Sequence, residues 1–276
     1  MSELETNPQQ GSVGLAAKLR ALTSARVGLG RTGVSLETRE VLDFQRAHAR
    51  ARDAVHSRLD VAALAVDLER ATQLEVLCLH SACGDRATYL QRPDLGRRLD
   101  ESSRKRLAAR SEGPDRDGIG CELAVIIADG LSSLAVERHA VPLLIELLPQ
   151  GNGWSLGGWT FGPIVVVEQG RVAIGDEIGL ALKAQISVVL IGERPGLSSP
   201  DSLGAYITWD PRPGRSDAER NCISNIRAEG LSYGKAAEQL RSLLTEARKR
   251  QLTGVALKLE FDTRMLESGT ERSLGK

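Results

Sequence analysis

Three short apolar segments in the second half of the chain constrain the fold more than any other feature. They are rich in β-branched residues and almost free of polar ones: Leu123–Ile127, Ile164–Val167 and Ser187–Ile191. Segments with helical apolar spacing lie between them. A strand that is buried on both faces has this unbroken apolar character, and helices are the usual crossover between parallel strands. The sequence therefore predicts an α/β fold with a mostly parallel sheet covered on both sides.

The chain before residue 111 is dominated by helical spacing. We predict helices over Thr38–Leu59 and Val61–Ala71, whereas Leu74–Leu79 is compatible with a strand. A charged stretch with Gly and Pro then marks a domain boundary. We divide the chain into a flexible tail (1–12), a mainly helical N-terminal domain (13–110), a linker (111–118), a Rossmann-like domain (119–255) and a C-terminal extension (256–276).

Charge and composition argue against several classes of protein. Lys+Arg and Asp+Glu number 36 each, so the formal net charge is zero and no bulk positive field attracts nucleic acid or anionic lipid. No apolar run nears the roughly 18 residues of a membrane-spanning helix, and Met1–Glu5 is acidic where a secretory signal is basic. Four scattered cysteines do not make a disulfide scaffold. We expect a cytoplasmic protein with reduced thiols.

Two motifs match functional patterns without the context those patterns need. Gly28–Gly33 fits the G-x-G-x-x-G dinucleotide fingerprint, but no apolar strand precedes it and Asp53 lies within a predicted helix. We interpret this segment as a Gly-rich connector. Cys78–Cys83 contains three soft ligands, yet no second cluster completes a tetrahedral metal site. We therefore predict no metal site.

Two loops follow the predicted strands directly. Ligands of open α/β sheets bind at the carboxyl ends of the strands, where Asp129–Ser133 and Gly192–Leu197 lie. Glu193 is the first side chain after its strand that can form an outward hydrogen bond. The residues alone leave open the alternative that Glu193 only forms a surface ion pair with Arg194.

Several motifs together resemble a known family. In chain order they are Arg92–Leu99, Asp129–Ser133, Gly170–Val172, Gly192–Leu197 and Cys222–Ile226. The same segments occur in the same order in the small (light) subunit of ethanolamine ammonia-lyase. The resemblance extends from about Leu19 to Gly254, which is most of the chain. An ordered set of motifs is far more specific than any one of them.

The resemblance implies an adenosylcobalamin-dependent lyase that converts ethanolamine to acetaldehyde and ammonia by radical chemistry. It implies a hetero-oligomer with a large subunit whose barrel holds the substrate, so no catalytic residue is expected here. The resemblance also implies that the small subunit covers the cobalamin, with contacts at Val172, Glu193 and Cys222. These residue types suit a corrin, which has an apolar face and an amide-fringed rim. The residues alone leave open a strand-edge Val, a surface Glu and a packed thiol.

The sequence departs from the family in two places. Family members often carry a longer N-terminal extension linked to packaging in a bacterial microcompartment, so the short tail leaves such packaging open. After Asn225 the family often continues with Ile-His and a Gly-Gly-Thr-Pro-Pro turn, where this chain has Ile226–Tyr233. The altered loop leaves open a cofactor-free interaction protein that kept the fold. A second alternative is a stand-alone Rossmann-like enzyme that uses a nucleotide, although the sequence offers neither a sound phosphate loop nor an acid–base constellation for it.

Overall fold

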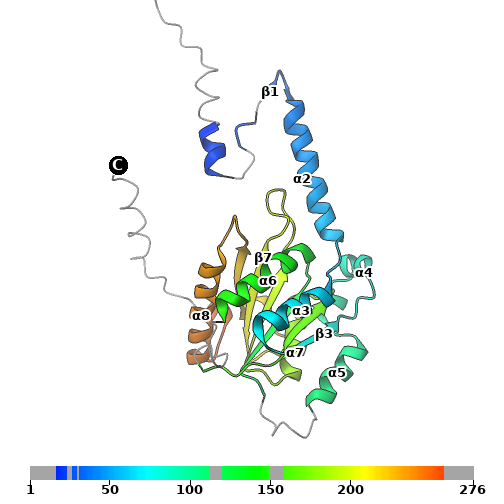
Figure 1. The fold of residues 1–276 in the computed structure, drawn as a ribbon, viewed down its shortest axis with the longest axis vertical. Helices are drawn as coiled ribbons and strands as arrows, with labels where there is room; N and C mark the ends of the chain where they lie inside the picture. The colour runs from blue at the N-terminus through cyan, green and yellow to red at the C-terminus, as the bar shows by residue number, and fades with distance from the viewer. Residues whose placement is uncertain (1–16, 24–26, 30, 112–119, 149–157, 258–276) are drawn as a thin grey trace, which may run out of the picture.

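The computed structural model describes residues 17–23, 27–29, 31–111, 120–148 and 158–257. At its centre lies a six-stranded sheet in the order β3-β5-β4-β6-β7-β8 (Figure 1). The first four strands in this order run parallel, and β7 and β8 are antiparallel additions. The α/β class and the mostly parallel sheet are thus confirmed. The strands are β3 (Val76–His80), β4 (Leu123–Ala128), β5 (Ile164–Glu168), β6 (Ile186–Gly192), β7 (Leu203–Trp209) and β8 (Arg220–Ile226).

One face of the sheet carries the larger part of the core. The helices α3 (Val61–Thr72), α6 (Ser133–Leu147) and α8 (Tyr233–Arg250) pack on it. Their apolar stripes interlock with the strands, and Leu144 and Leu240 are completely buried there. Every residue of β4 and β6 is buried, because helices cover both faces of these two strands. This burial explains why both strands appear in the sequence as unbroken apolar runs.

The opposite face is covered by α5 (Glu101–Ser111) and α7 (Ile174–Ala181). Gly175 lets α7 approach β6 closely, since a Cβ at this position would lie 2.4 Å from Val189 Cγ2. A methyl group there would force the helix away from the sheet. Glycine at this position is therefore a packing requirement.

The described N-terminal part combines a projecting helix with one strand of the sheet. Helix α2 (Thr38–His56) extends away from the body (Figure 1), and Ala54 is its one buried residue. The hairpin β1 (Arg31–Thr32) and β2 (Ser35–Leu36) precedes it. Strand β3 pairs with β5, so the sheet takes strands from both sides of residues 111–118. Other short helices of the described part are α4 (Arg86–Gln91), η1 (Leu95–Arg97), η2 (Asp217–Glu219) and η3 (Gly254–Ala256).

The proposed domain division stays a prediction, as do the Rossmann-like assignment and a separate helical N-terminal domain. The expected tail 1–12 lies outside the described residues. Most of the expected linker, residues 112–118, and residues 258–276 of the expected extension lie outside them as well.

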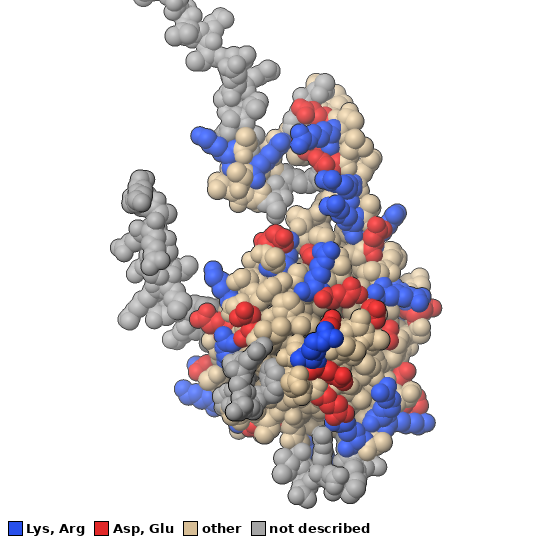
Figure 2. All heavy atoms as spheres, viewed as in Figure 1, with Lys and Arg blue, Asp and Glu red and all other residues tan. Residues whose placement is uncertain are grey.

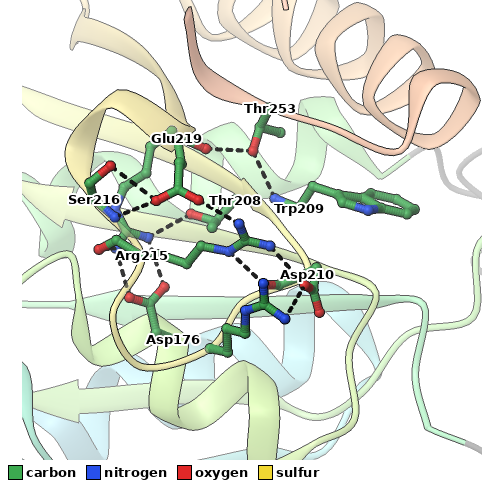
Figure 3. A network of polar contacts seen from close by, with 10 residues as sticks. Asp176, Thr208, Trp209, Asp210, Arg215, Ser216, Glu219 and Thr253 are labelled. Carbon is green, nitrogen blue, oxygen red and sulfur yellow. Dashed lines mark hydrogen bonds and ion pairs between the residues drawn. The ribbon is translucent and has the colours of Figure 1, made fainter. Parts of the chain in front are cut away.

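A buried polar network joins α7 to β7 and β8 on the α7 side of the sheet (Figure 3). Arg220 donates two hydrogen bonds of 2.7 Å to the carboxylate of Asp176, and their side chains are only 1% and 3% exposed. Arg220 also donates to Thr208 Oγ1 at 2.8 Å. Nearby, Thr253 donates to the carbonyl of Glu219 at 2.6 Å. The network fastens α7 and the residues after α8 to the antiparallel strands.

Candidate functional site

The structure places the three predicted cobalamin contacts on the α7 side of the sheet. Glu193 directly follows β6, Val172 lies between β5 and α7, and Cys222 lies within β8. Cys222 is the cross-strand partner of Tyr206 in β7. Val172 and Tyr206 pack against the same apolar cluster, and Glu193 is an electrostatic neighbour of Cys222. Glu193 and Cys222 are thus neighbours, and Val172 lies on the same side of the sheet.

The carboxylate of Glu193 is held by three donors. The hydroxyl of Ser224 donates to Oε1, and the hydroxyl of Ser202 donates to Oε2. The backbone N–H of Asn225 also donates to Oε2, at 3.2 Å, from a residue in the left-handed conformation with φ of 59°. Among the described residues, the ion pairs include none between Glu193 and Arg194. The alternative interpretation of Glu193 as a surface ion pair is therefore not what the structure contains.

Cys222 presents a neutral thiol next to this carboxylate. Its side chain is exposed at the surface of β8. Partial desolvation by neighbouring atoms raises the pKa of the Cys222 thiol, and the charge of Glu193 raises it further, against the lowering effect of the Tyr206 hydroxyl. A thiol with a raised pKa stays protonated near neutral pH. Cys222 is therefore suited to apolar contact rather than to nucleophilic chemistry.

The loop after β4 packs against the end of β6 and so determines where the loop that carries Glu193 begins. The N–H of Leu131 donates to the carbonyl of Gly192 at 2.9 Å. A Cβ at Gly192 would lie 2.0 Å from the carbonyl oxygen of Ser132, and a Cβ at Gly130 would lie 2.2 Å from that of Gly192. The hydroxyl of Ser132 also donates to the carbonyl of Pro200 at 2.9 Å. Backbone packs directly on backbone here, which only glycine permits.

A buried arginine lies beneath these loops. Arg86 is 7% exposed, and its Nη1 donates to the carbonyl of Gly130 at 2.8 Å and to Gln169 Oε1 at 3.3 Å. The same nitrogen lies 3.5 Å from Asp129 Oδ2. Its Nε donates to the carbonyl of Val55, near the end of α2, at 2.7 Å. Arg86 thus links α2 to the loops that follow β4 and β5.

Asp129 gives this cluster a pH dependence. Burial raises the pKa of Asp129 to about 6, although Arg86 and neighbouring backbone N–H groups lower it. The folded protein therefore keeps a proton that the unfolded chain releases at about pH 4. Asp129 therefore contributes fully to the free energy of unfolding below about pH 4. This contribution is lost as the pH rises from about 4 through about 6.

We expect Asp129→Asn to gain stability relative to the wild type as the pH rises. The amide cannot ionise, so the difference in unfolding free energy should change by about 2 kcal/mol in favour of the variant between pH 4 and pH 7. Urea titrations at both pH values measure it. Asp217→Asn is the control, because Asp217 is 97% exposed. Parallel pH profiles for Asp129→Asn and the wild type would contradict the prediction.

The two motifs judged weak in the sequence stay apart from this surface. Within Gly28–Gly33, Arg31–Thr32 form strand β1 of the β1–β2 hairpin, which is a sheet of its own. Cys78 and His80 lie in β3, and Cys83 is buried after it. Within the described ranges, no group of three or more His, Cys, Asp or Glu side chains is placed to hold a metal ion.

Sequence reasoning gave no site role to four residues of the surface, two of them within the motif Cys222–Ile226, and did not predict the two strands that carry most of them. Ser202, Tyr206, Ser224 and Asn225 gather around Glu193 and Cys222 through the pairing of β7 with β8. The β-branched and aromatic residues of β7 were a signal for that strand. The pairing of β7 with β8 has a register irregularity between Leu203 and Ala205, which no local sequence pattern predicts.

Charges of both signs are mixed on the face of the molecule drawn in Figure 2. Figure 2 shows Lys and Arg interspersed with Asp and Glu over the face that it draws, in keeping with the zero formal charge of the whole sequence. None of the described helices combines the length and the hydropathy needed to span a membrane.

Fold and surface together define an α/β protein with a candidate ligand site beside the carboxyl ends of its parallel strands. Residues 15–258 match the family described as "Ethanolamine ammonia-lyase light chain (EutC)". The chain belongs to this ethanolamine ammonia-lyase light-chain family, a family of lyase subunits, as its motifs predicted.

Similar proteins carry the corresponding name. The chain is 57% identical over 255 residues to an "Ethanolamine ammonia-lyase small subunit" of Pseudomonas aeruginosa (strain UCBPP-PA14), covering 92% of this chain and 91% of the relative. It is 54% identical over 268 residues to the protein of the same name from Pseudomonas syringae pv. tomato, covering 97% and 90%. The relative from Pseudomonas fluorescens (strain Pf0-1) is 57% identical over 251 residues, covering 91% and 89%.

Proposed function

We propose that this chain is the subunit that covers the cobalamin of an ethanolamine ammonia-lyase, the enzyme that converts ethanolamine to acetaldehyde and ammonia. Family membership supports the lyase, and the name "small subunit" of its relatives supports a large-subunit partner in a hetero-oligomer. One structural observation carries the cofactor part of the proposal. The carboxylate of Glu193 is held beside the exposed thiol of Cys222 on a sheet surface.

The residues on this surface fit adenosylcobalamin. Val172 and Cys222 would contact the apolar face of the corrin, and Glu193 would accept a hydrogen bond from an amide N–H of its rim. Three donors already occupy the carboxylate, which has about four acceptor positions, so one is left for the cofactor. Gly204 leaves room for the carboxylate, since a Cβ there would lie 2.9 Å from Glu193 Oε1.

The division of labour follows from this fit. When bound, the cofactor would supply the radical chemistry. This chain would bind the corrin, orient its rim and exclude water from one side, with substrate residues on the large subunit and no catalytic residue of its own. A cytoplasmic location, and packaging in a bacterial microcompartment, stay predictions from the sequence.

Glu193→Ala is expected to weaken cobalamin binding by the complex with the large subunit. Removal of the Glu193 carboxylate leaves an amide N–H of the buried corrin rim without an acceptor. The loss in binding free energy is about 1–3 kcal/mol, or roughly fivefold to more than a hundredfold in affinity. Equilibrium dialysis of adenosylcobalamin against the assembled complex measures the change. Glu193→Gln keeps a carbonyl acceptor and is expected to lose less.

Glu238→Ala is the matched control, because Glu238 is exposed on α8, on the other side of the sheet. It should bind cobalamin as the wild type does. Unchanged affinity in Glu193→Ala would remove Glu193 from the cofactor site.

Ammonia release from ethanolamine separates the proposal from its alternatives. The chain is co-expressed with a large subunit, and each chain is also assayed alone with adenosylcobalamin. Ammonia release by the co-expressed chains, and by neither chain separately, would support the complex. An assembled complex that lacks both cobalamin and activity would favour the cofactor-free interaction protein. Binding of a dinucleotide by this chain alone would favour a nucleotide-using enzyme, which the β1–β2 hairpin does not support.

A further inference from the structure

Glu193 is linked to two different strands through its own backbone and both carboxylate oxygens. Its N–H donates to the carbonyl of Ser202 at 2.9 Å, while the Ser202 hydroxyl donates back to Oε2. The Ser224 hydroxyl donates to the other oxygen, Oε1. Ser202 is 5% exposed just before β7, and Ser224 is exposed near the end of β8. The carboxylate is thereby fixed from a buried side and from an exposed side.

The hydrogen bonds from Ser202 and Ser224 restrict the conformation of the Glu193 side chain as well as pairing its carboxylate oxygens. A glutamate side chain has three rotatable bonds, and the free energy of ordering it reduces what a new hydrogen bond can contribute to binding. Donors that fix each oxygen separately determine the plane of the carboxylate as well as its position. Hydrogen bonds to a charged acceptor are also stronger than those between neutral groups.

We propose that Ser202 and Ser224 are positioning residues that hold the Glu193 carboxylate in the orientation needed to accept an amide N–H from the corrin rim. This inference rests on the proposed function, because it assumes that Glu193 contacts the cofactor. Neither serine itself needs to touch the cobalamin. Their effect on the affinity for cobalamin passes through Glu193.

The test is a double-mutant cycle in the assembled complex with the large subunit. Affinity for adenosylcobalamin is measured by equilibrium dialysis for Ser202→Ala, Ser224→Ala and Glu193→Ala, and for each serine variant combined with Glu193→Ala. Each serine variant alone is expected to weaken binding about threefold to tenfold. Within the Glu193→Ala background neither should weaken it further, because the side chain that they position is gone.

Two further variants sharpen the result. Ser224→Thr keeps the hydroxyl and is expected to bind cobalamin nearly as the wild type does. Ser198→Ala removes an exposed hydroxyl from the loop between Glu193 and β7, and should leave the affinity unchanged. If Ser224→Ala weakens cobalamin binding and Ser224→Thr does not, the effect comes from the lost hydroxyl donor and not from altered packing.

The outcomes separate this inference from the proposed function. If Glu193→Ala weakens binding while both serine variants bind normally, the positioning role is overturned and the cofactor site stands. If the serine variants weaken binding equally with and without Glu193, they act by another route and the positioning role is again overturned. If Glu193→Ala leaves the affinity unchanged, both the assignment of Glu193 and the positioning role fail.

Discussion

Asp176→Ala is expected to lower the free energy of unfolding by about 3–5 kcal/mol. Asp176 is the buried partner of Arg220, whose side chain is 1% exposed. Without the carboxylate, the guanidinium stays buried with Thr208 Oγ1 and the carbonyl of Arg215 as its acceptors, but with no buried opposite charge. Urea denaturation at neutral pH, followed by circular dichroism, measures the loss.

A second carboxylate near Arg220, that of Asp217, supplies the control for this prediction. Asp217 lies 3.7 Å from Arg220 Nε but is 97% exposed, so Asp217→Ala should cost less than about 1 kcal/mol. The joint replacement Asp176→Leu with Arg220→Met removes both charges and should recover much of the stability lost by Asp176→Ala. Equal losses in Asp176→Ala and Asp217→Ala would show that burial does not set the strength of this pair.

Gly130→Ala is expected to cost about 4 kcal/mol and to disturb the Glu193 loop. The residue has φ of 59°, which strains any side chain by about 1–2 kcal/mol. Its new Cβ would also lie 2.2 Å from the carbonyl oxygen of Gly192, a backbone atom that cannot rotate away. Such overpacking adds about 1–3 kcal/mol. Denaturation measures the stability, and cobalamin dialysis of the assembled complex measures the effect on the site.

Gly33→Ala distinguishes the two causes. Gly33 has a similar φ of 64°, but a Cβ there would meet no atom within 4 Å. Only the backbone strain applies, so the expected loss is at most about 1–2 kcal/mol. Cobalamin affinity should be unchanged, because Gly33 lies in the β1–β2 hairpin. Similar losses in the two alanine variants would indicate that contact between the loops after β4 and β6 contributes little.

The sequence proposed three members of the candidate site, but neither the residues around them nor their arrangement. Motif resemblance alone named Val172, Glu193 and Cys222. The structure adds Ser202 and Ser224, which hold Glu193 from 9 and 31 residues further along the chain. Serines at such separations carry no spacing signal. Their meeting depends on the antiparallel pairing that brings β7 and β8 beside β6.

The sequence by itself determined the parallel core and the family. Strands buried on both faces must be apolar throughout, so the segments of β4, β5 and β6 were visible locally, as were the long helices. Only the tertiary structure decided that β3 joins this sheet and that β7 and β8 extend it. It also decided that Arg220 meets Asp176 and that Arg86 meets Gly130, each 44 residues away. The physical reason is that periodicity records how deeply a segment is buried, whereas the choice and register of its neighbours depend on the packing of the whole chain.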